Sequence, residues 1–353
     1  MASQPRTPQA TEPPSPSFTV AAILPLFNGE AWVERTLGGI LAQTLAPDEI
    51  LVIDDGSTDG GPQLVRELAK AHPQIRLISQ ANAGQSAARN VAITMCTSEW
   101  IALIDQDDFW YPNHLEQLVG AARRHAGLRL GLVYSDFDDV DGGGGMVSRD
   151  PLARAWVDNP KRDLMKVLAQ GFLIQPSTTL IKREAVREVG GFDERLMAYE
   201  DDDLFLRMFR AGYDNVFVPS TTSQWRIHEL SAGGSERADD SLRLYQAKLL
   251  EAYPNDRWRG HYYRSDAIAP RFIRVWLTLY TRAGRYHDHK RMRAYAKEAR
   301  ALVKHLRPRA RMLMGPVLFL VGRPFLFRLP ARTPRSLRGR PGFGLLGRGF
   351  TGL

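Results

Sequence analysis

Three carboxylates lie within four residues of one another, directly after a segment that is typical of a buried strand. Asp105, Asp107 and Asp108 follow the apolar run 100–104. In open α/β sheets, ligands bind outside the carboxyl ends of the strands, so these acids are expected at a ligand-binding edge. Carboxylates this close repel one another, and Mg²⁺ or Mn²⁺ neutralises them with few protein ligands when substrate phosphates complete the coordination. The alternative is a solvated acidic turn that caps a helix beginning near Pro112.

A second acidic group lies at the predicted start of a helix. Residues 200–203 read Glu-Asp-Asp-Asp, and the helical pattern continues through Ala211. The helix dipole favours negative charge at this end, so the group could serve as a cap alone. The same dipole would also keep a carboxylate ionised and able to accept a proton. Further along, His228 is either a structural histidine or a metal ligand.

A third acidic run, at 136–141, precedes four glycines. It looks like a calcium loop at first sight, but placing Gly142 at the sixth position puts Phe137 and Ser148 at ligand positions. The sequence therefore predicts a solvated hairpin or loop here.

The elements that must position these acids alternate between strand and helix. We expect strands at 18–24, 49–53, 75–79 and 100–104, with helices at 30–43, 62–71 and 85–94. Further strands are expected at 130–135, 176–182 and 215–219. Alternation at this pitch predicts βαβ units and a mostly parallel sheet. Neither a G-x-G-x-x-G after a strand nor a P-loop sequence occurs, so phosphates would be held by another device.

Positive charge is concentrated toward the end of the 353-residue chain. From Arg257 onward there are 23 Lys/Arg and 3 Asp/Glu, a net +20, against −12 for the residues before it. Such a segment suggests an anionic partner, either a membrane or a nucleic acid. No nucleic-acid module or aromatic platform accompanies it, so no nucleic-acid partner is predicted. The apolar stretch Met312–Val321 is too short to span a bilayer, and its flanking arginines suit the plane of an anionic membrane surface. The alternative is a core helix that packs on the catalytic domain with its arginines outside.

These patterns divide the chain into four parts. Residues 1–17 are proline-rich and are expected to form a disordered leader without a signal peptide. Residues 18–235 form the α/β domain, 236–330 a basic helical extension, and 331–353 a disordered basic tail. The single cysteine, Cys96, excludes a disulfide framework and suits a reducing compartment.

Several short blocks, taken in order, carry a resemblance to a known family. They read Phe27-Asn-Gly-Glu30, Ile53-Asp-Asp-Gly-Ser-Thr-Asp59, Asn82-Ala-Gly-Gln-Ser-Ala-Ala-Arg-Asn90, Asp105-Gln-Asp-Asp108, Gly191-Phe-Asp-Glu194, Glu200-Asp201 and Arg226-Ile-His228. Between about Phe18 and Ser231 the chain thus resembles the nucleotide-sugar glycosyltransferases of family 2. The resemblance implies the GT-A fold, a Rossmann-like, mostly parallel sheet flanked by helices, here followed by the basic helical extension.

The resemblance also implies residue roles. Pro25, Phe27 and Asp55 would line the base and ribose of the donor nucleotide, and Arg89 would lie by the nucleotide or its diphosphate. Asp105 would approach the ribose, and Glu30 and Gln106 would complete the donor-binding set. Asp107 would hold a Mg²⁺ or Mn²⁺ ion on the diphosphate, with His228 as a second metal or phosphate contact. Asp201 would be the general base, with Glu200 supporting it or touching the sugar.

The function that these residues imply is transfer of a sugar from a nucleoside-diphosphate sugar to a hydroxyl of a glycan or lipid-linked acceptor. UDP is the first expectation for the nucleotide, with dTDP and GDP as alternatives. One base opposite one leaving group means a single displacement, so the anomeric configuration should invert. Processive members carry Gln-x-x-Arg-Trp and membrane spans, whereas this chain has Gln224-Trp-Arg226, which favours a non-processive enzyme. We expect a role in cell-envelope polysaccharide synthesis, at the inner face of the cell membrane and peripherally bound to it from the cytoplasm.

Two other functions are compatible with the pattern. A catalytically inactive binding module would keep the fold, but the intact Asp107 and Asp201 argue against it. A nucleotidyltransferase also builds a parallel sheet with acidic metal ligands. It would be expected to have a glycine-rich, basic loop after the first strand, and residues 25–30 lack that character.

Overall fold

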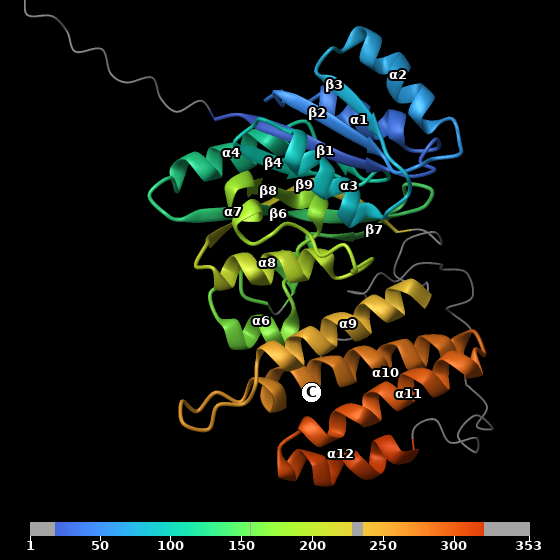
Figure 1. Ribbon diagram of the computed structural model, residues 1–353, viewed down its shortest axis with the longest axis vertical. Coiled ribbons are helices and arrows are strands. Elements are labelled where there is room, and N and C mark those ends of the chain that lie inside the picture. The colour runs from blue at the N-terminus through green and yellow to red at the C-terminus, as the bar shows by residue number, and fades with distance from the viewer. Residues whose placement is uncertain (1–17, 156, 228–235, 321–353) are drawn as a thin grey trace, which may run out of the picture.

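The structure is a computed structural model that describes residues 18–155, 157–227 and 236–320. The expected leader and tail, and His228, lie outside the described residues. The predicted boundary at residue 235 falls in the gap at 228–235, so the domain division stays a prediction. Figure 1 shows a curled sheet with its covering helices at one end of the molecule and a stack of helices at the other.

A nine-stranded mixed sheet organises the first part of the chain, in the order β3-β2-β1-β4-β8-β6-β9-β5, with β7 paired to β6. The strands are β1 (Val20–Leu26), β2 (Glu49–Asp54), β3 (Ile75–Ser79), β4 (Trp100–Leu103), β5 (Phe109–Trp110), β6 (Leu130–Asp141), β7 (Met146–Arg149), β8 (Thr179–Lys182) and β9 (Asp214–Ile227). Strands β3, β2, β1 and β4 run parallel to one another, as expected from the strand–helix alternation. Beyond β4 the sheet is mixed, because β8 runs antiparallel to both β4 and β6.

The central strands are apolar on both faces because helices cover both sides of the sheet. In β1, Ala22 and Leu24 contribute to one hydrophobic core and Ala21 and Ile23 to the other. Such continuous apolar runs are typical of strands buried on both faces.

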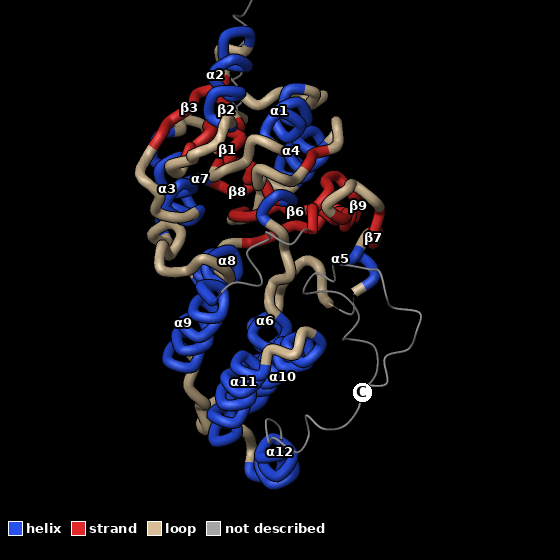
Figure 2. The backbone as a smooth tube through the Cα atoms, turned by 90° about the vertical axis from the view of Figure 1, so that its right-hand side faces the viewer, coloured by secondary structure: helices blue, strands red, loops and turns tan. Residues whose placement is uncertain are grey.

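The helices form two covering layers. They are α1 (Val33–Leu41), α2 (Gly61–Ala71), α3 (Gln85–Met95), α4 (His114–Arg124), α5 (Pro151–Arg154), α6 (Leu164–Gln170), α7 (Arg183–Glu188) and α8 (Glu200–Arg210). Buried side chains of α1, α2 and α4 belong to one core, and those of α3, α6, α7 and α8 to the other. The side view separates α1 and α4 from α3 across the strands (Figure 2).

The basic extension packs below α8. It comprises α9 (Glu236–Ala252), a π-helical turn (Tyr263–Ile268), α10 (Ala269–Arg285), α11 (His289–Leu302), a 3₁₀ turn (Val303–His305) and α12 (Pro308–Leu320). Tyr245, Phe272 and Trp276 are fully buried in the same core that α3 and α8 line. Within the described residues, no helix combines the length and apolar character needed to cross a bilayer.

The acidic run 136–141 belongs to a hairpin of β6 and β7, as one of the two predicted forms requires, but Asp136, Asp138 and Asp139 are buried and not solvated. It continues β6, because β9 runs to Ile227 and pairs with it as far as Asp141. Asp136 is buried and accepts the backbone N–H groups of Leu152 and Ala153 at the start of α5. Asp138 is also buried and accepts the Tyr111 hydroxyl. Hydrogen bonds from donors 16 to 27 residues away therefore replace the water expected around these acids.

One buried ion pair joins the extension to α8. The guanidinium of Arg271 on α10 lies 2.5 Å from a carboxylate oxygen of Asp202, and both side chains are almost wholly buried. Asp202 also accepts the backbone N–H of Phe172. The third residue of α8 is thereby held in place by the extension.

We expect Arg271→Leu to lower the free energy of unfolding by about 3–5 kcal/mol, because it leaves the Asp202 carboxylate buried without its partner. Urea unfolding would measure the change. Lys290→Leu removes an exposed pair with Glu236 on the same extension and is the matched control, with no measurable change expected. Equal effects of the two variants would show that the Arg271 pair does not stabilise the contact.

Candidate active site

Two loops after parallel strands are fastened to each other at the predicted edge. The side-chain amide of Gln106, after β4, accepts the N–H of Phe27 at 2.8 Å and donates to the Phe27 carbonyl at 3.1 Å, after β1. A Cβ on Gly29 would come 2.4 Å from the same amide, which explains the glycine. On α1, the Thr36 hydroxyl lies 2.7 Å from the Gln106 carbonyl oxygen and 2.9 Å from that of Asp108. We call residues 105–108 the Asp loop. These hydrogen bonds hold the Asp loop in place without any ligand.

Asp55, directly after β2, organises a third loop. Its buried carboxylate accepts the backbone N–H groups of Ala83 and Gly84, each at 2.8 Å, and the Gln80 amide at 2.7 Å. Gly84 has φ +92°, a conformation that favours glycine. Asp55 thus shapes the segment that leads into α3.

The other predicted donor-binding residues lie along the same edge. Pro25 is half-buried in β1, and the Phe27 ring is 46% exposed. The Glu30 carboxylate accepts the N–H of Gly60 at 3.0 Å and so fastens the β1 loop to the start of α2. The structure brings this side of the predicted set together.

Arg89 on α3 lies at the centre of the site. Its fully buried guanidinium donates to Asp105 at 2.5 Å and to Glu200 at 2.8 Å. Burial alone would lower the pKa of this guanidinium, but the charges of Asp105 and Glu200 outweigh burial and raise it. The resemblance implied that Arg89 lies by the nucleotide or its diphosphate. In the structure Arg89 bridges Asp105, the acid after β4, to Glu200, the first acid of α8.

The four acids of α8 differ in their partners. Glu200 accepts from Arg89 and from the Gln85 amide. Asp202 pairs with Arg271, and Asp203 pairs with Arg207 and Lys248. Within the described ranges 18–155, 157–227 and 236–320, the Asp201 carboxylate accepts the backbone N–H of Asp202 and meets no side-chain donor. Asp201 is therefore the acid of this group that a substrate hydroxyl could approach.

The surroundings of Asp201 make it a stronger base. Burial first, and then the charges of Glu200 and Asp202, raise its pKa well above the ordinary value, while Arg89 acts in the other direction. Part of the residue still reaches the surface. The helix dipole alone was expected to favour the ionised form; burial and the neighbouring acids act against it.

Two contacts that complete the Asp loop, residues 105–108, could not be found from the sequence: those of the Ser177 hydroxyl and of the Arg226 backbone N–H. Asp108 is buried, accepts the N–H of Arg226 at 2.9 Å and is hydrogen-bonded by the Ser177 hydroxyl. Ser177 also accepts the N–H of Asp105 at 3.0 Å. Ser177 belongs to none of the motifs in the sequence, so only its tertiary contacts identify it. Burial, followed by the charges of Asp107 and Asp105, raises the pKa of Asp108 well above its usual range.

The residues at this edge are compatible with a divalent cation held mainly by substrate oxygens. Residues 18–155, 157–227 and 236–320 contain no group of three His, Cys, Asp or Glu side chains placed to hold a metal. Asp107 is half-buried on the loop, and the carboxylates around it are close enough to raise the pKa of Asp108. One carboxylate plus phosphates is the arrangement that Mg²⁺ commonly takes. His228, the other predicted ligand, lies outside the described residues.

Comparison with known sequences identifies the family of this site. Residues 21–190 match the sequence profile of Glycosyl transferase family 2, and this region contains Asp55, Arg89, Asp105 and Asp107. Residues 21–190 are thereby identified as belonging to glycosyltransferase family 2. It is similar to the "Putative glycosyltransferase EpsH" of Bacillus subtilis (strain 168), with 28% identity over 239 residues, covering 66% of this chain and 65% of the relative.

It is also 28% identical over 193 residues to a chondroitin synthase of Escherichia coli, covering 55% of this chain but 27% of the relative. The chain thus spans less than two thirds of the length of these two relatives.

Solved structures support the fold. S. aureus TarS (residues 1–349), crystallised with UDP-GlcNAc, has a TM-score of 0.60 and 16% identity, covering 85% of this chain and 86% of that one. The same fragment was crystallised with UDP, with a TM-score of 0.59 and 17% identity over the same shares. At this identity the similarity concerns the fold, which is the predicted GT-A fold with a helical C-terminal region.

We expect Arg89→Lys to lower the free energy of unfolding by about 1–3 kcal/mol, because one ammonium nitrogen cannot occupy the positions of the two guanidinium nitrogens that now bond Asp105 and Glu200, so one of these hydrogen bonds is lost. The matched control is Arg195→Lys, which changes an exposed pair with Asp193. Thermal and urea unfolding of both variants would measure the difference. If the two variants unfold alike, the Arg89 bridge does not hold Asp105 and Glu200 together.

Proposed function

We propose that the protein is a metal-dependent, inverting glycosyltransferase that moves a sugar from a nucleoside-diphosphate sugar to a hydroxyl of a glycan or lipid-linked acceptor. The observation that supports it best is Asp201. This acid has a raised pKa and no side-chain partner among the described residues, whereas Glu200, Asp202 and Asp203 beside it each pair with a cation.

The reaction needs few groups. The acceptor oxygen attacks the anomeric carbon as the bond from that carbon to the diphosphate oxygen breaks. The proton of the attacking hydroxyl passes to the Asp201 carboxylate, and the nucleoside diphosphate leaves with the bonding electrons. With a single base and a single leaving group the displacement occurs once, so the anomeric configuration inverts.

Glu200, Asp105 and Asp107 would contribute by positioning the site and its ligands, without taking a proton. Glu200 and Asp105 share the Arg89 guanidinium, so this bridge would set the distance between α8 and the edge that receives the donor. Asp107, with His228 as a second contact, would hold a Mg²⁺ or Mn²⁺ ion. That ion would supply charge neutralisation for the departing diphosphate.

Pro25, Phe27, Glu30, Asp55 and Gln106 would form the nucleotide side of the site. UDP is the proposed nucleotide, and the UDP and UDP-GlcNAc complexes of the TarS fragment support that choice. For the acceptor we propose a polymer or lipid-linked glycan of the cell envelope, presented at the inner face of the membrane. Addition of one or a few sugars fits the absence of Gln-x-x-Arg-Trp from the sequence.

A panel of nucleotide sugars tests this function. Purified full-length protein with Mg²⁺ or Mn²⁺ should release nucleoside diphosphate from one donor far faster than from the others. Release of a sugar 1-phosphate with transfer of the nucleotidyl group, or release of pyrophosphate when a nucleoside triphosphate and a sugar 1-phosphate are supplied instead, would favour a nucleotidyltransferase. Tight donor binding without any release, in the presence of envelope extracts as acceptor, would favour an inactive binding module.

The assignment of the base predicts that Asp201→Asn keeps the shape of the site but removes the basic oxygen. Turnover should fall by about 10²- to 10⁴-fold, the usual contribution of a general base. The donor dissociation constant, measured by calorimetry, should stay nearly unchanged. The exposed Asp240→Asn is the control and should leave turnover unchanged. Near-normal turnover of Asp201→Asn would mean that another residue is the base.

The raised pKa of Asp201 predicts the acid side of the pH profile. The base must be deprotonated, so kcat/KM should fall as the pH falls through this raised pKa, above the range of an ordinary aspartate. Stopped assays across the acid range would measure it. A flat profile down to the ordinary pKa of aspartate would contradict the burial effect.

The metal assignment predicts that Asp107→Ala abolishes turnover and removes the effect of chelator on donor binding. Calorimetry of the nucleoside diphosphate with and without Mg²⁺ gives a readout that does not depend on activity. Asp138→Ala, which removes a carboxylate that bonds to Tyr111, is the control and should keep metal-dependent binding. Donor binding that ignores both chelator and the Asp107 change would rule out this ligand.

A further inference from the structure

We propose that the end of the molecule opposite the sheet docks on an anionic lipid bilayer, with Trp258 as its anchor. The docking surface consists of the hairpin 254–262 and the exposed face of α12. This inference goes beyond the proposed reaction, since none of these residues belongs to the catalytic site.

The hairpin is held in a fixed conformation. Asp256 and His261 exchange two backbone hydrogen bonds, of 2.6 and 2.9 Å. The Asp256 carboxylate accepts the N–H groups of Trp258 and Arg259 at 3.0 and 3.1 Å. At the base of the hairpin, Asn255 accepts the N–H of Arg264 at 2.9 Å. Hydrogen bonds within the hairpin therefore hold its tip, residues 257–260, in one conformation.

The tip presents a tryptophan to solvent. Trp258 is 100% exposed and is flanked by Arg257 and Arg259, both exposed. An exposed indole on a constrained loop gains nothing from the fold, and indoles concentrate at membrane interfaces, where the ring meets acyl chains and its N–H stays hydrated. Arginines on either side can contact lipid phosphates. Residue types and exposure at the tip thus suit a lipid interface.

The exposed face of α12 extends this surface with aliphatic side chains. Leu318 is fully buried against the core, whereas Met312, Leu313 and Val317 are 71%, 69% and 54% exposed. One side of the helix therefore packs on the protein, and the other presents apolar surface. Large exposed apolar patches mark interaction sites.

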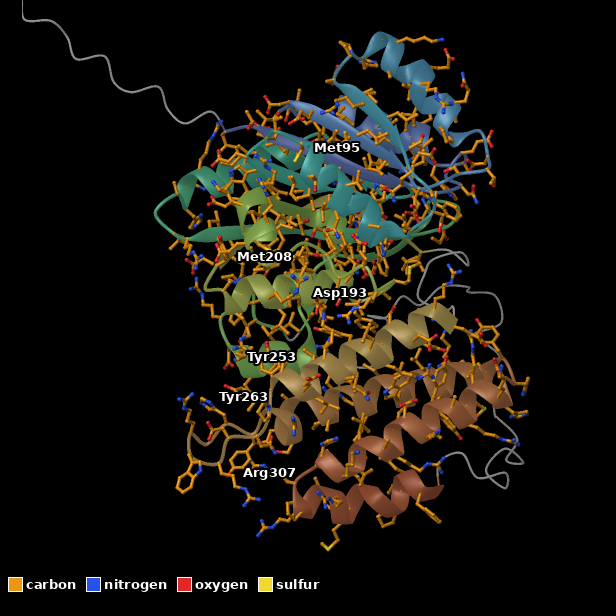
Figure 3. The ribbon with its side chains drawn as sticks, in the orientation of Figure 1. Met95, Asp193, Met208, Tyr253, Tyr263 and Arg307 are labelled. Carbon is orange, nitrogen blue, oxygen red and sulfur yellow. The ribbon has the colours of Figure 1, made fainter. Side chains whose placement is uncertain are left out.

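The hairpin and α12 begin at the same end of the molecule. The Arg307 guanidinium, just before α12, lies 4.5 Å from the centre of the Tyr262 ring and donates to Asp266 at 2.6 Å. Arg307 and Tyr263 lie together at the lower left of Figure 3, far from the sheet. The base of the hairpin and the start of α12 thus lie side by side at the end of the molecule that faces away from the sheet.

The charge around this surface complements an anionic leaflet. Residues 257–320 contain 16 Lys/Arg and 3 Asp/Glu. Each of the three acids is already paired: Asp266 with Arg307, Asp288 with Arg291 and Glu298 with Arg243. The surplus is positive, and clusters of basic residues bind anionic lipid surfaces. Aliphatic side chains on α12 fit acyl chains better than they fit a nucleic acid, which offers phosphates and base faces.

Sedimentation with vesicles tests the proposal on the full-length protein. It should pellet with vesicles of phosphatidylglycerol and phosphatidylcholine, and binding should weaken as salt is added. Trp258→Ala should weaken binding by at least about tenfold, since insertion of a large apolar side chain is worth that much or more. Arg257→Glu with Arg259→Glu should weaken it by a similar factor.

Tyr286→Ala provides the matched control. This tyrosine is 75% exposed but lies in the α10–α11 connection, at the other end of α10. The Tyr286→Ala substitution should leave vesicle binding unchanged. All of these variants should keep the melting temperature and the nucleotide affinity of the parent protein, so a failure of vesicle binding is separable from a failure of the proposed reaction.

Four results would overturn the proposal. They are equal binding to vesicles of phosphatidylcholine alone, equal effects of Trp258→Ala and Tyr286→Ala, tighter binding to an oligonucleotide than to anionic vesicles, and concentration-dependent self-association that Trp258→Ala abolishes.

Discussion

The site depends on one buried cation. The Arg89 guanidinium is shielded from water, and its charge is compensated by Asp105 and Glu200, which come from segments 16 and 111 residues away in sequence. Leaving either carboxylate out would strand a buried charge, which is strongly destabilising. The bridge therefore sets the position of α8 relative to the sheet edge. The bridge also accounts for the position of Asp201. Because the Glu200 side chain bonds to Arg89, the Asp201 side chain, next along the helix, points in another direction and does not share this cation.

Pairing of an acid with a basic side chain from another part of the chain also occurs further along α8 and links it to the extension. Asp202 is held by Arg271 of α10, and Asp203 by Arg207 and Lys248, so successive acids are fixed by different elements. The extension is consequently part of the support of the site, and its buried aromatic residues share a core with α3 and α8. A docking surface at the far end of this extension would hold the site in a defined orientation to a membrane that presents the acceptor.

Much of the architecture was predictable, because apolar runs of strand length alternate with helical patterns up to β4. The acids at the strand ends were predictable for the same reason, since a parallel sheet collects its carboxyl ends at one edge. Partners were not. Ser177 and Arg226 complete the Asp loop through contacts 69 and 118 residues apart, and no local pattern encodes such pairings. Burial of Asp136 and Asp138 was missed because their donors come from elsewhere in the chain.

The central claim is that Asp201 alone serves as base opposite one leaving group, so that the sugar is displaced once. The anomeric configuration of the product tests it most directly. With the donor that the protein uses, NMR of the first product formed should show the anomeric configuration opposite to that of the donor. Retention of the donor configuration would require a second displacement and a nucleophile on the protein, and it would contradict the account.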